Sequence, residues 1–261
     1  CGEGLTWQLS GGTLRISGKG EMQSFTDETM PPWYPQAASI TTVSITEGVT
    51  SVGDRAFFGC TSITNVRLPS TVVSIGAFSF KNCSSLEYVY LPANLTAIGE
   101  SAFENCINLK GITLPNGLQS IGSFAFYRCT ALTTISIPAS LIRLGTVVFA
   151  YCTGLVRAEI HSRLTALPDW TFYGCTSLTE VSLPQTVTAT GEDSFRDCKN
   201  LQTIYYDGTA DVTPPQGSGT DTEVRPTEEM PSSGSNLRWD IPGNAGESIT
   251  VTDTGNSNLT E

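Results

Sequence analysis

Histidine is almost absent from this sequence, since His161 is the only one among 261 residues. A Ser–His–Asp or Cys–His catalytic set would therefore depend on that one ring. Lysine and arginine are also scarce: 14 of them stand against 25 Asp and Glu, which gives a net charge of -11. This balance argues against nucleic-acid binding, which needs clustered basic residues. No apolar run approaches the length of about 20 residues that a transmembrane helix needs, so we expect no membrane-spanning segment.

What the sequence does contain is a repeat of 23 residues that runs to about residue 206. Each copy has a cysteine, a phenylalanine three residues before it, and a leucine or isoleucine three residues after it. The cysteines are Cys60, Cys83, Cys106, Cys129, Cys152, Cys175 and Cys198. Proline mostly stands nine residues after the cysteine, and glycine mostly sixteen residues after it. Several residue types in phase at one interval indicate a repeat architecture, in which coils stack on one another.

Each copy predicts one coil of a solenoid. In the copy that begins at Cys60, Val66-Arg67-Leu68 alternates apolar and polar residues, as a short strand does. Pro69 lacks an N–H group and ends that strand. Segments such as Ala56-Phe57-x-x-Cys60 place apolar side chains on one side of a helical turn. We therefore expect a parallel sheet with one strand per copy, and a short helix in each coil.

The pattern C-x-x-L-x-x-I-x-L-P-x-x-L-x-x-I-G-x-x-A-F-x-x resembles the BspA-type leucine-rich repeat of bacterial surface proteins, over about 170 of the 261 residues. The resemblance implies a leucine-rich repeat solenoid, a right-handed β/α superhelix with a parallel β-sheet on its concave face. Short helices or 3-10 turns are implied for the convex face. The resemblance also implies a secreted or cell-surface protein that functions in adhesion or protein binding, with host extracellular-matrix or surface proteins among the candidate partners.

Residues 1–36 are interpreted as a cap for the first coil. Residues 5–9 and 14–16 alternate apolar and polar side chains, and Gly11-Gly12 supplies a turn between them, so we expect a β-hairpin. Trp33 and Tyr34 either pack over the end of the stack or bind a ligand, and packing is the favoured interpretation. Cys1 either carries a lipid anchor or is an ordinary residue at the domain edge, and the second is favoured. We expect that a signal peptide has been removed ahead of Cys1.

The seven in-phase cysteines allow three interpretations. A metal site needs thiolates that converge on one point, whereas residues that recur once per coil point in parallel. Disulfides between coils would lack converging Cβ vectors, and seven thiols cannot all pair. A buried ladder of free thiols, each acting as a small hydrophobic group, is therefore favoured. We predict no metal and no cofactor from this sequence.

The copy CTGLVRAEIHSRLTALPDWTFYG is the least regular one. His161 replaces the proline, and we expect a surface turn residue rather than a general base. Pro168 replaces the glycine and predicts a bend in the solenoid, where Asp169 caps the short helix. Glu159 and Glu180 lie on neighbouring coils and could face a sugar as a glycosidase pair, but no cleft is evident around them. We predict that the protein is not an enzyme.

The fifth and seventh positions after each cysteine lie on the outer face of the strands, where repetition leaves them free to vary. Tyrosine and arginine are favoured in protein interfaces because they bury a large area and still form hydrogen bonds. We predict a binding patch that consists of Asn65, Arg67, Glu87, Tyr88, Tyr90 and Lys110. Three alternatives stay open: a solvated sheet face with cross-strand packing, a carbohydrate-binding surface with sugars stacked on the tyrosines, and a structural spacer.

The repeat domain, residues 37–206, is followed by a stretch of different composition. Residues 207–235 are rich in Pro, Gly, Ser, Thr and acidic residues, which is typical of a linker. Residues 236–261 show brief alternation, and we expect a short β segment that covers the last coil or begins a further module. The sequence does not indicate an oligomeric state.

Overall fold

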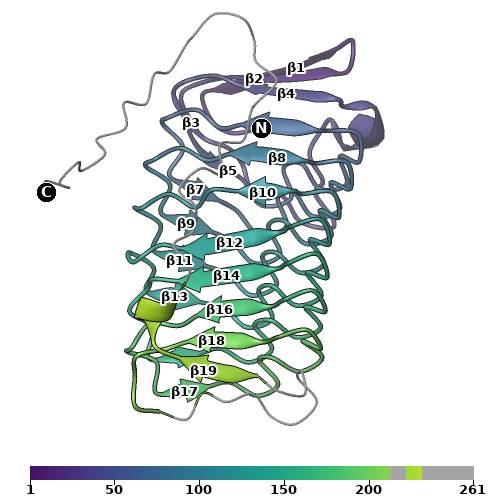
Figure 1. Ribbon diagram of the computed structural model, residues 1–261. Coiled ribbons are helices and arrows are strands. Elements are labelled where there is room, and N and C mark those ends of the chain that lie inside the picture. The colour runs from purple at the N-terminus through teal and green to yellow at the C-terminus, as the bar shows by residue number, and fades with distance from the viewer. Residues whose placement is uncertain (211, 213–221, 231–261) are drawn as a thin grey trace, which may run out of the picture. The chain divides into compact units, whose positions relative to one another are not determined.

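The computed structural model describes residues 1–210, 212 and 222–230. The chain winds in successive coils, and each coil of the repeat contributes two short strands (Figure 1). The first strand of each coil is the predicted one, and these strands form the first row. Its members are β4 (Thr42–Ile45), β6 (Asn65–Arg67), β8 (Tyr88–Tyr90), β10 (Gly111–Ile112), β12 (Thr134–Ile137), β14 (Arg157–Ile160), β16 (Glu180–Ser182) and β18 (Thr203–Tyr205).

A second row of strands was not predicted. It occupies the fourteenth and fifteenth positions after the cysteine, where two residues are too few to show a period of two. Its members are β3 (Gly20–Glu21), β5 (Val49–Val52), β7 (Ser74–Ile75), β9 (Ala97–Ile98), β11 (Ser120–Ile121), β13 (Arg143–Leu144), β15 (Ala166–Leu167) and β17 (Ala189–Thr190). Strands β3 to β13 form one six-stranded sheet, and β15 pairs with β17.

Strands of adjacent coils pair in parallel, and each residue lies opposite the residue 23 positions away in the next coil. Asn65 lies opposite Tyr88 and Arg67 lies opposite Tyr90, so equivalent positions of successive copies are neighbours. Buried side chains such as Val66 and Val89 thus line up inside, while the residues on either side of them face outward. The first row is divided among three sheets: β4 pairs with an N-terminal strand, β6-β8-β10 forms the second sheet, and a longer sheet begins at β12.

Seven phenylalanines form one continuous stack in the core. Neighbouring rings from Phe57 to Phe195 have centroids 5.0–5.8 Å apart, and all these side chains are buried. The Trp33 ring continues the stack, with its centroid 6.4 Å from that of Phe57. Its indole Nε1 donates a hydrogen bond to the Ala56 carbonyl (2.7 Å). The prediction that Trp33 packs at the end of the stack is confirmed.

The seven in-phase cysteines are buried and free of disulfides, as predicted. From Cys83 onward, each thiol donates a hydrogen bond to the carbonyl of the phenylalanine 26 residues earlier, at 3.0–3.2 Å. Burial raises the pKa of Cys60, Cys152 and Cys198 to about 12. The thiols are therefore neutral core groups that also tie each coil to the previous one.

The third side of each coil, called here the turn side, contains turns in place of the predicted short helix. The N–H groups of Phe78, Phe80 and Asn82 donate to carbonyls of the next coil, each at 2.8 Å, whereas an α-helix would use them for its own i→i−4 bonds. Phe78 and Asn82 have left-handed φ values of 57° and 63°. The short helix expected in each coil does not form here, whereas the 3-10 alternative is confirmed: isolated i→i−3 turns take its place, such as the one from the Lys81 N–H to the Phe78 carbonyl (3.2 Å). Among the described residues, 3-10 helices occur as η1 (Tyr34–Ser39) and η2 (Thr227–Glu229).

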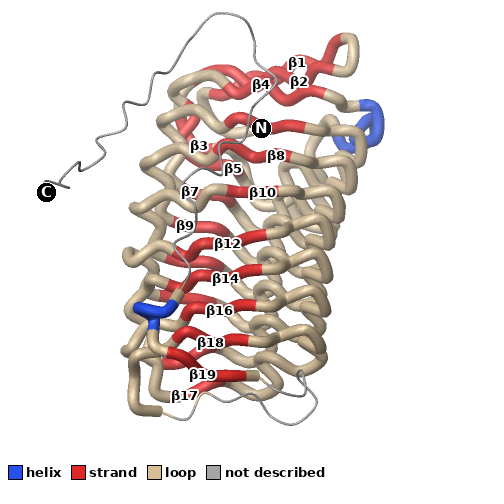
Figure 2. Tube along the Cα trace, in the orientation of Figure 1, coloured by secondary structure: helices blue, strands red, loops and turns tan. Residues whose placement is uncertain are grey.

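The N-terminal hairpin forms as predicted. Strands β1 (Leu5–Ser10) and β2 (Thr13–Gly18) pair antiparallel across the two-residue turn Gly11-Gly12, and both glycines have positive φ values, as such a turn requires. Strand β2 then pairs parallel with β4. The hairpin therefore covers the edge of the first coil (Figure 2).

The predicted linker, residues 207–235, is wrong in one part. Glu223–Arg225 forms β19, which pairs parallel with β18, and Val212 is buried. Strand β18 has edge N–H and C=O groups that need partners, and average composition does not reveal which nearby residues supply them. The β segment that we expect within residues 236–261 lies outside the described residues.

Candidate binding face

The predicted patch comes together on the outer face of β6, β8 and the start of β10. The guanidinium carbon of Arg67 lies 4.7 Å from the centroid of the Tyr90 ring, directly across the strand pair. The ammonium of Lys110 lies 5.8 Å from the centroid of the Tyr88 ring. Asn65 is opposite Tyr88 and is exposed. The 23-residue register explains the contacts of Asn65 and Arg67, which lie beside residues of equivalent position, whereas Lys110 stands one residue before the strand partner of Tyr88.

Glu87 holds Lys110 in place at the edge of this patch. The Lys110 Nζ lies 2.8 Å from Glu87 Oε2, and this hydrogen bond raises the pKa of Lys110. Both side chains are partly exposed, at 47% and 39%, so the pair adds little to stability. Its effect is geometric: the ammonium is held over Tyr88. We call the six residues Asn65, Arg67, Glu87, Tyr88, Tyr90 and Lys110 the strand-face patch.

The carboxylates considered as a glycosidase pair share one guanidinium. Arg157 Nε lies 2.9 Å from a Glu159 oxygen, and Arg157 Nη1 lies 3.4 Å from a Glu180 oxygen. His161 is 53% exposed and contacts Glu159 at 3.3 Å, which places it at the surface as predicted. Glu159 and Glu180 therefore form an ion-pair cluster with Arg157, rather than a pair of carboxylates that faces a substrate.

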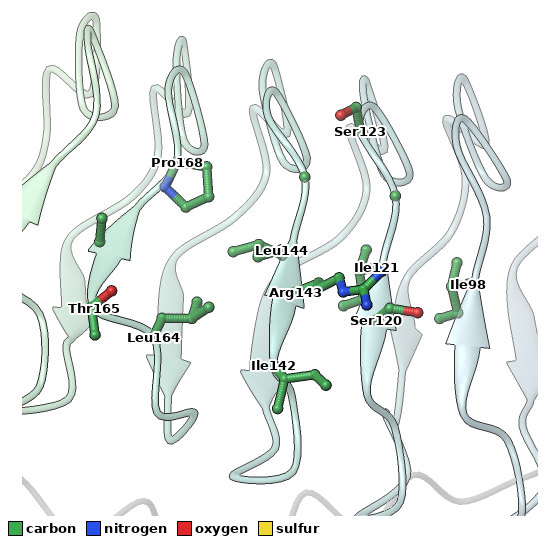
Figure 3. A pocket seen from close by; sticks show the side chains of 13 residues that line it. Ile98, Ser120, Ile121, Ser123, Ile142, Arg143, Leu144, Leu164, Thr165 and Pro168 are labelled. Atoms are coloured by element: carbon green, nitrogen blue, oxygen red, sulfur yellow. The ribbon is translucent and has the colours of Figure 1, made fainter.

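Pro168 interrupts the second row of strands. In other copies the glycine N–H donates to the previous coil, as Gly145 does to the Ile121 carbonyl (2.9 Å), but proline has no N–H to give. Strands β13 and β15 do not pair, and a cavity of about 600 Å³ opens between them (Figure 3). Among the described residues, Arg143 is the only charged side chain that lines it, so these residues bring no acid, base and nucleophile together there.

The expected helix cap at Asp169 is wrong, because its carboxylate reaches the next coil instead. Asp169 Oδ1 accepts the N–H of Glu192 at 2.8 Å. Asp54 does the same for Ala77 at 2.7 Å. In the part of the chain that the structure describes, no group of three His, Cys, Asp or Glu side chains could hold a metal ion, and no helix is long and apolar enough to cross a membrane.

Sequence reasoning overlooked the aromatic side chains exposed on the turn side. Tyr151 is 37% exposed and Trp170 is 44% exposed. They stand 22 and 18 residues after the cysteine of their coil. Other copies carry polar residues such as Asn105, or glycine, at the first of these positions, whereas the second holds either a polar residue such as Ser101 or a large one such as Phe78. Tyr151 therefore departs from the other copies, but this signal becomes informative only once the two positions are known to share one face.

Comparison with known families matches residues 33–156 and 97–213 to the family described as BspA type leucine rich repeat region, with six copies. The two ranges together run over more than half of the chain. Comparison with curated proteins finds no match.

Solved structures show the same fold. A leucine-rich repeat protein of T. pallidum, TpLRR, is 28% identical with a TM-score of 0.59, over 76% of this chain and 88% of that one. The pneumococcal vaccine antigen PcpA is 20% identical with a TM-score of 0.55, and the match covers 71% of this chain and 50% of that one. With the 23-residue register, the buried cysteine and phenylalanine ladders and the family match in hand, we conclude that this chain belongs to the BspA-type leucine-rich repeat family.

Proposed function

We propose that this protein, secreted or displayed on a cell surface, binds another protein through the strand-face patch. The observation that supports the proposal most is the pairing of Arg67 with Tyr90 across β6 and β8. The two side chains restrain each other in the free protein, so less conformational entropy is lost when a partner covers them. Tyrosine and arginine are also the residue types that most often dominate binding energy at interfaces.

The composition of the patch favours a protein partner over a sugar. Arg67 and Lys110 lie over the rings of Tyr90 and Tyr88 and occupy ring faces that a stacked sugar would use. Glu87 forms a charged rim beside them, which suits charge complementarity with a partner and faster association. A typical interface covers about 800 Å² per partner, so the patch would be its centre and neighbouring outward residues its rim.

Host extracellular-matrix proteins are the partners to test first, as the BspA family is one of bacterial surface proteins. Purified fibronectin, laminin and collagen are immobilised, and binding of the full chain is measured by biolayer interferometry. The double variant Arg67→Ala, Tyr90→Ala should weaken binding at least tenfold, since truncating central interface residues typically costs about 2 kcal/mol or more each.

The control variant Thr134→Ala, Ser136→Ala alters two outward-facing residues of β12, two coils beyond Tyr90. It should bind as the unaltered protein does, and both variants should keep their unfolding midpoints within a few degrees. Equal binding by the patch variant and the control would remove the patch as the site. Absence of binding to any protein of the panel would favour the spacer interpretation.

A further inference from the structure

We infer that the turn side carries a second binding site, a slot for a neutral saccharide formed by aromatic side chains of three coils. The slot has a volume of about 390 Å³, within the range of about 300–1,000 Å³ typical of small-molecule sites. Its lining residues are Phe124, Tyr127, Val147, Ala150, Tyr151, Trp170, Tyr173, Asp193 and Arg196. None of them belongs to the strand-face patch.

The slot arises because one coil with small residues lies between two coils with aromatic ones. Positions 18 and 21 after the cysteine are Phe124 and Tyr127 in one coil and Trp170 and Tyr173 two coils later. The coil between them has Val147 and Ala150 at these positions, and both are buried as the floor. Two coil steps of about 4.8 Å separate the walls by roughly 10 Å. The Tyr151 ring contacts both Tyr127 and Tyr173. The room for one ring-shaped ligand therefore lies between Phe124 and Trp170.

Tyr151 is fixed by its neighbours at the edge of the slot. Its ring packs edge-on against Tyr127 and Tyr173, with centroids 5.7 and 5.2 Å away, and the hydrogen bond with Tyr173 raises the pKa of Tyr151. Gly174 makes this possible, because a Cβ there would lie 2.9 Å from the Tyr151 ring. These aromatic side chains therefore form an ordered arrangement in the free protein.

The backbone at position 18 is left-handed, a conformation that bulky residues adopt only at a cost in free energy. Position 18 has a positive φ in every coil in which the structure describes it, and its occupants include Val147 (62°), Trp170 (55°) and Phe124 (59°). Asn, Asp or Gly adopt this conformation more easily than bulky or β-branched residues do. Ser101 and Asp193 show that polar residues satisfy the fold at this position. The aromatic residues are thus not required by the turn itself.

The chemistry of the slot favours an uncharged ligand with both apolar faces and hydroxyl groups. Two charged residues line the slot in the described part of the chain, Asp193 and Arg196, and they bind each other at 3.0 Å, so a ligand needs no net charge to match them. Their remaining donors and acceptors, with the hydroxyls of the tyrosines, can bind sugar hydroxyls. Trp170 offers an exposed ring on which the C–H face of a pyranose can stack, because no ring or cation–π contact covers it among the described residues.

The test is isothermal titration calorimetry of the full chain with maltotriose, cellotriose, xylotriose and triacetylchitotriose, and with decaproline as the peptide alternative. At least one saccharide should bind, and two variants should weaken it at least tenfold. Trp170→Ser removes one wall. Val147→Phe fills the slot with a residue that Phe78 and Phe124 already show to be compatible with this backbone conformation.

The matched control is Phe78→Ser, which makes the same kind of change at position 18 of a coil outside the slot. It should bind the saccharide as the unaltered protein does. Saccharide binding that survives both slot variants, no saccharide binding at all, or binding of decaproline instead would each overturn the inference. Binding of matrix proteins by Trp170→Ser should be unchanged, so this result is independent of the strand-face proposal.

Discussion

The thiol of Cys83 donates a hydrogen bond to the backbone carbonyl of Phe57 in the previous coil, at 3.1 Å. The same contact recurs up to Cys198 and Phe172 (3.0 Å). The cysteine ladder thus satisfies one carbonyl per coil while it fills the core. Its reactivity and its response to pH follow from that burial.

Thiol labelling should separate Cys1 from the other seven cysteines. Cys1 is partly exposed, whereas the in-phase thiols are buried with raised pKa values, and it is the thiolate that reacts. With 5,5′-dithiobis(2-nitrobenzoate) at pH 8, we expect only Cys1 to react fast in the native protein. The remaining thiols should react after denaturation in guanidinium chloride. Fast labelling of all eight in protein with native circular dichroism would contradict the buried ladder.

Alkaline pH should destabilise the fold through the same thiols. The pKa of Cys60 is about 12 when folded, against an ordinary value of 9.0, so above pH 9 the unfolded chain releases a proton that the folded chain keeps. Stability is therefore complete below pH 9 and falls as the pH rises toward 12, by about 1.4 kcal/mol per buried thiol at pH 10. Urea unfolding at pH 8 and pH 10 measures this.

The control for the alkaline loss is a variant without one of these thiols, Cys60→Ser. Because a serine hydroxyl does not ionise in this range, the variant should lose about 1.4 kcal/mol less between pH 8 and pH 10. An identical pH dependence in the two proteins would show that tyrosine or lysine ionisation, not the cysteine ladder, causes the alkaline unfolding.

Trp33→Phe should destabilise the protein by about 1–3 kcal/mol, because the Ala56 carbonyl loses its buried donor. The phenyl ring would still stack on Phe57, but it is smaller than the indole, so the loss combines the missing hydrogen bond with a small cavity. Trp7→Phe is the comparison, since Trp7 is 39% exposed and should change the unfolding free energy by less than about 0.5 kcal/mol. Thermal and urea unfolding of both variants measure the difference.

The repeat itself could be predicted because several residue types mark the same interval of 23 residues. Cysteine, phenylalanine and leucine at one interval fixed the coil length, and parallel pairing of equivalent residues followed from it, so Arg67 and Tyr90 could be expected on neighbouring strands. The second row could not be predicted, because Ser74–Ile75 is a strand only through its partners in adjacent coils. The absence of helix has the same origin: the N–H of Phe80 bonds to the next coil, and no local pattern shows that.

The two candidate sites also differ in whether the sequence alone could predict them. The strand-face patch was predictable because period-two alternation identifies which residues of β6 and β8 face outward. The turn-side slot was not, because it depends on Trp170, Tyr151 and Val147 sharing one surface at positions whose direction is set by left-handed turns. The linker prediction failed at Glu223–Arg225 because pairing with the edge of β18 is a tertiary contact.

The glycine at position sixteen should be the least replaceable residue of each coil. A Cβ on Gly122 would lie 2.4 Å from the backbone nitrogen of Glu100 in the previous coil, closer than atoms can approach, so a side chain there requires the coils to separate. Pro168 occupies this position in its own coil, and that is where β13 and β15 stay unpaired and the cavity of Figure 3 opens. We therefore expect Gly122→Ala to destabilise the protein by about 1–3 kcal/mol through overpacking and to reduce hydrogen-exchange protection of the amides in β11. The control is Gly117→Ala, where the nearest atom to an added Cβ is 3.3 Å away. This change should cost less than about 1 kcal/mol. Equal losses in the two variants would mean that Gly122 does not act by allowing the coils to approach closely.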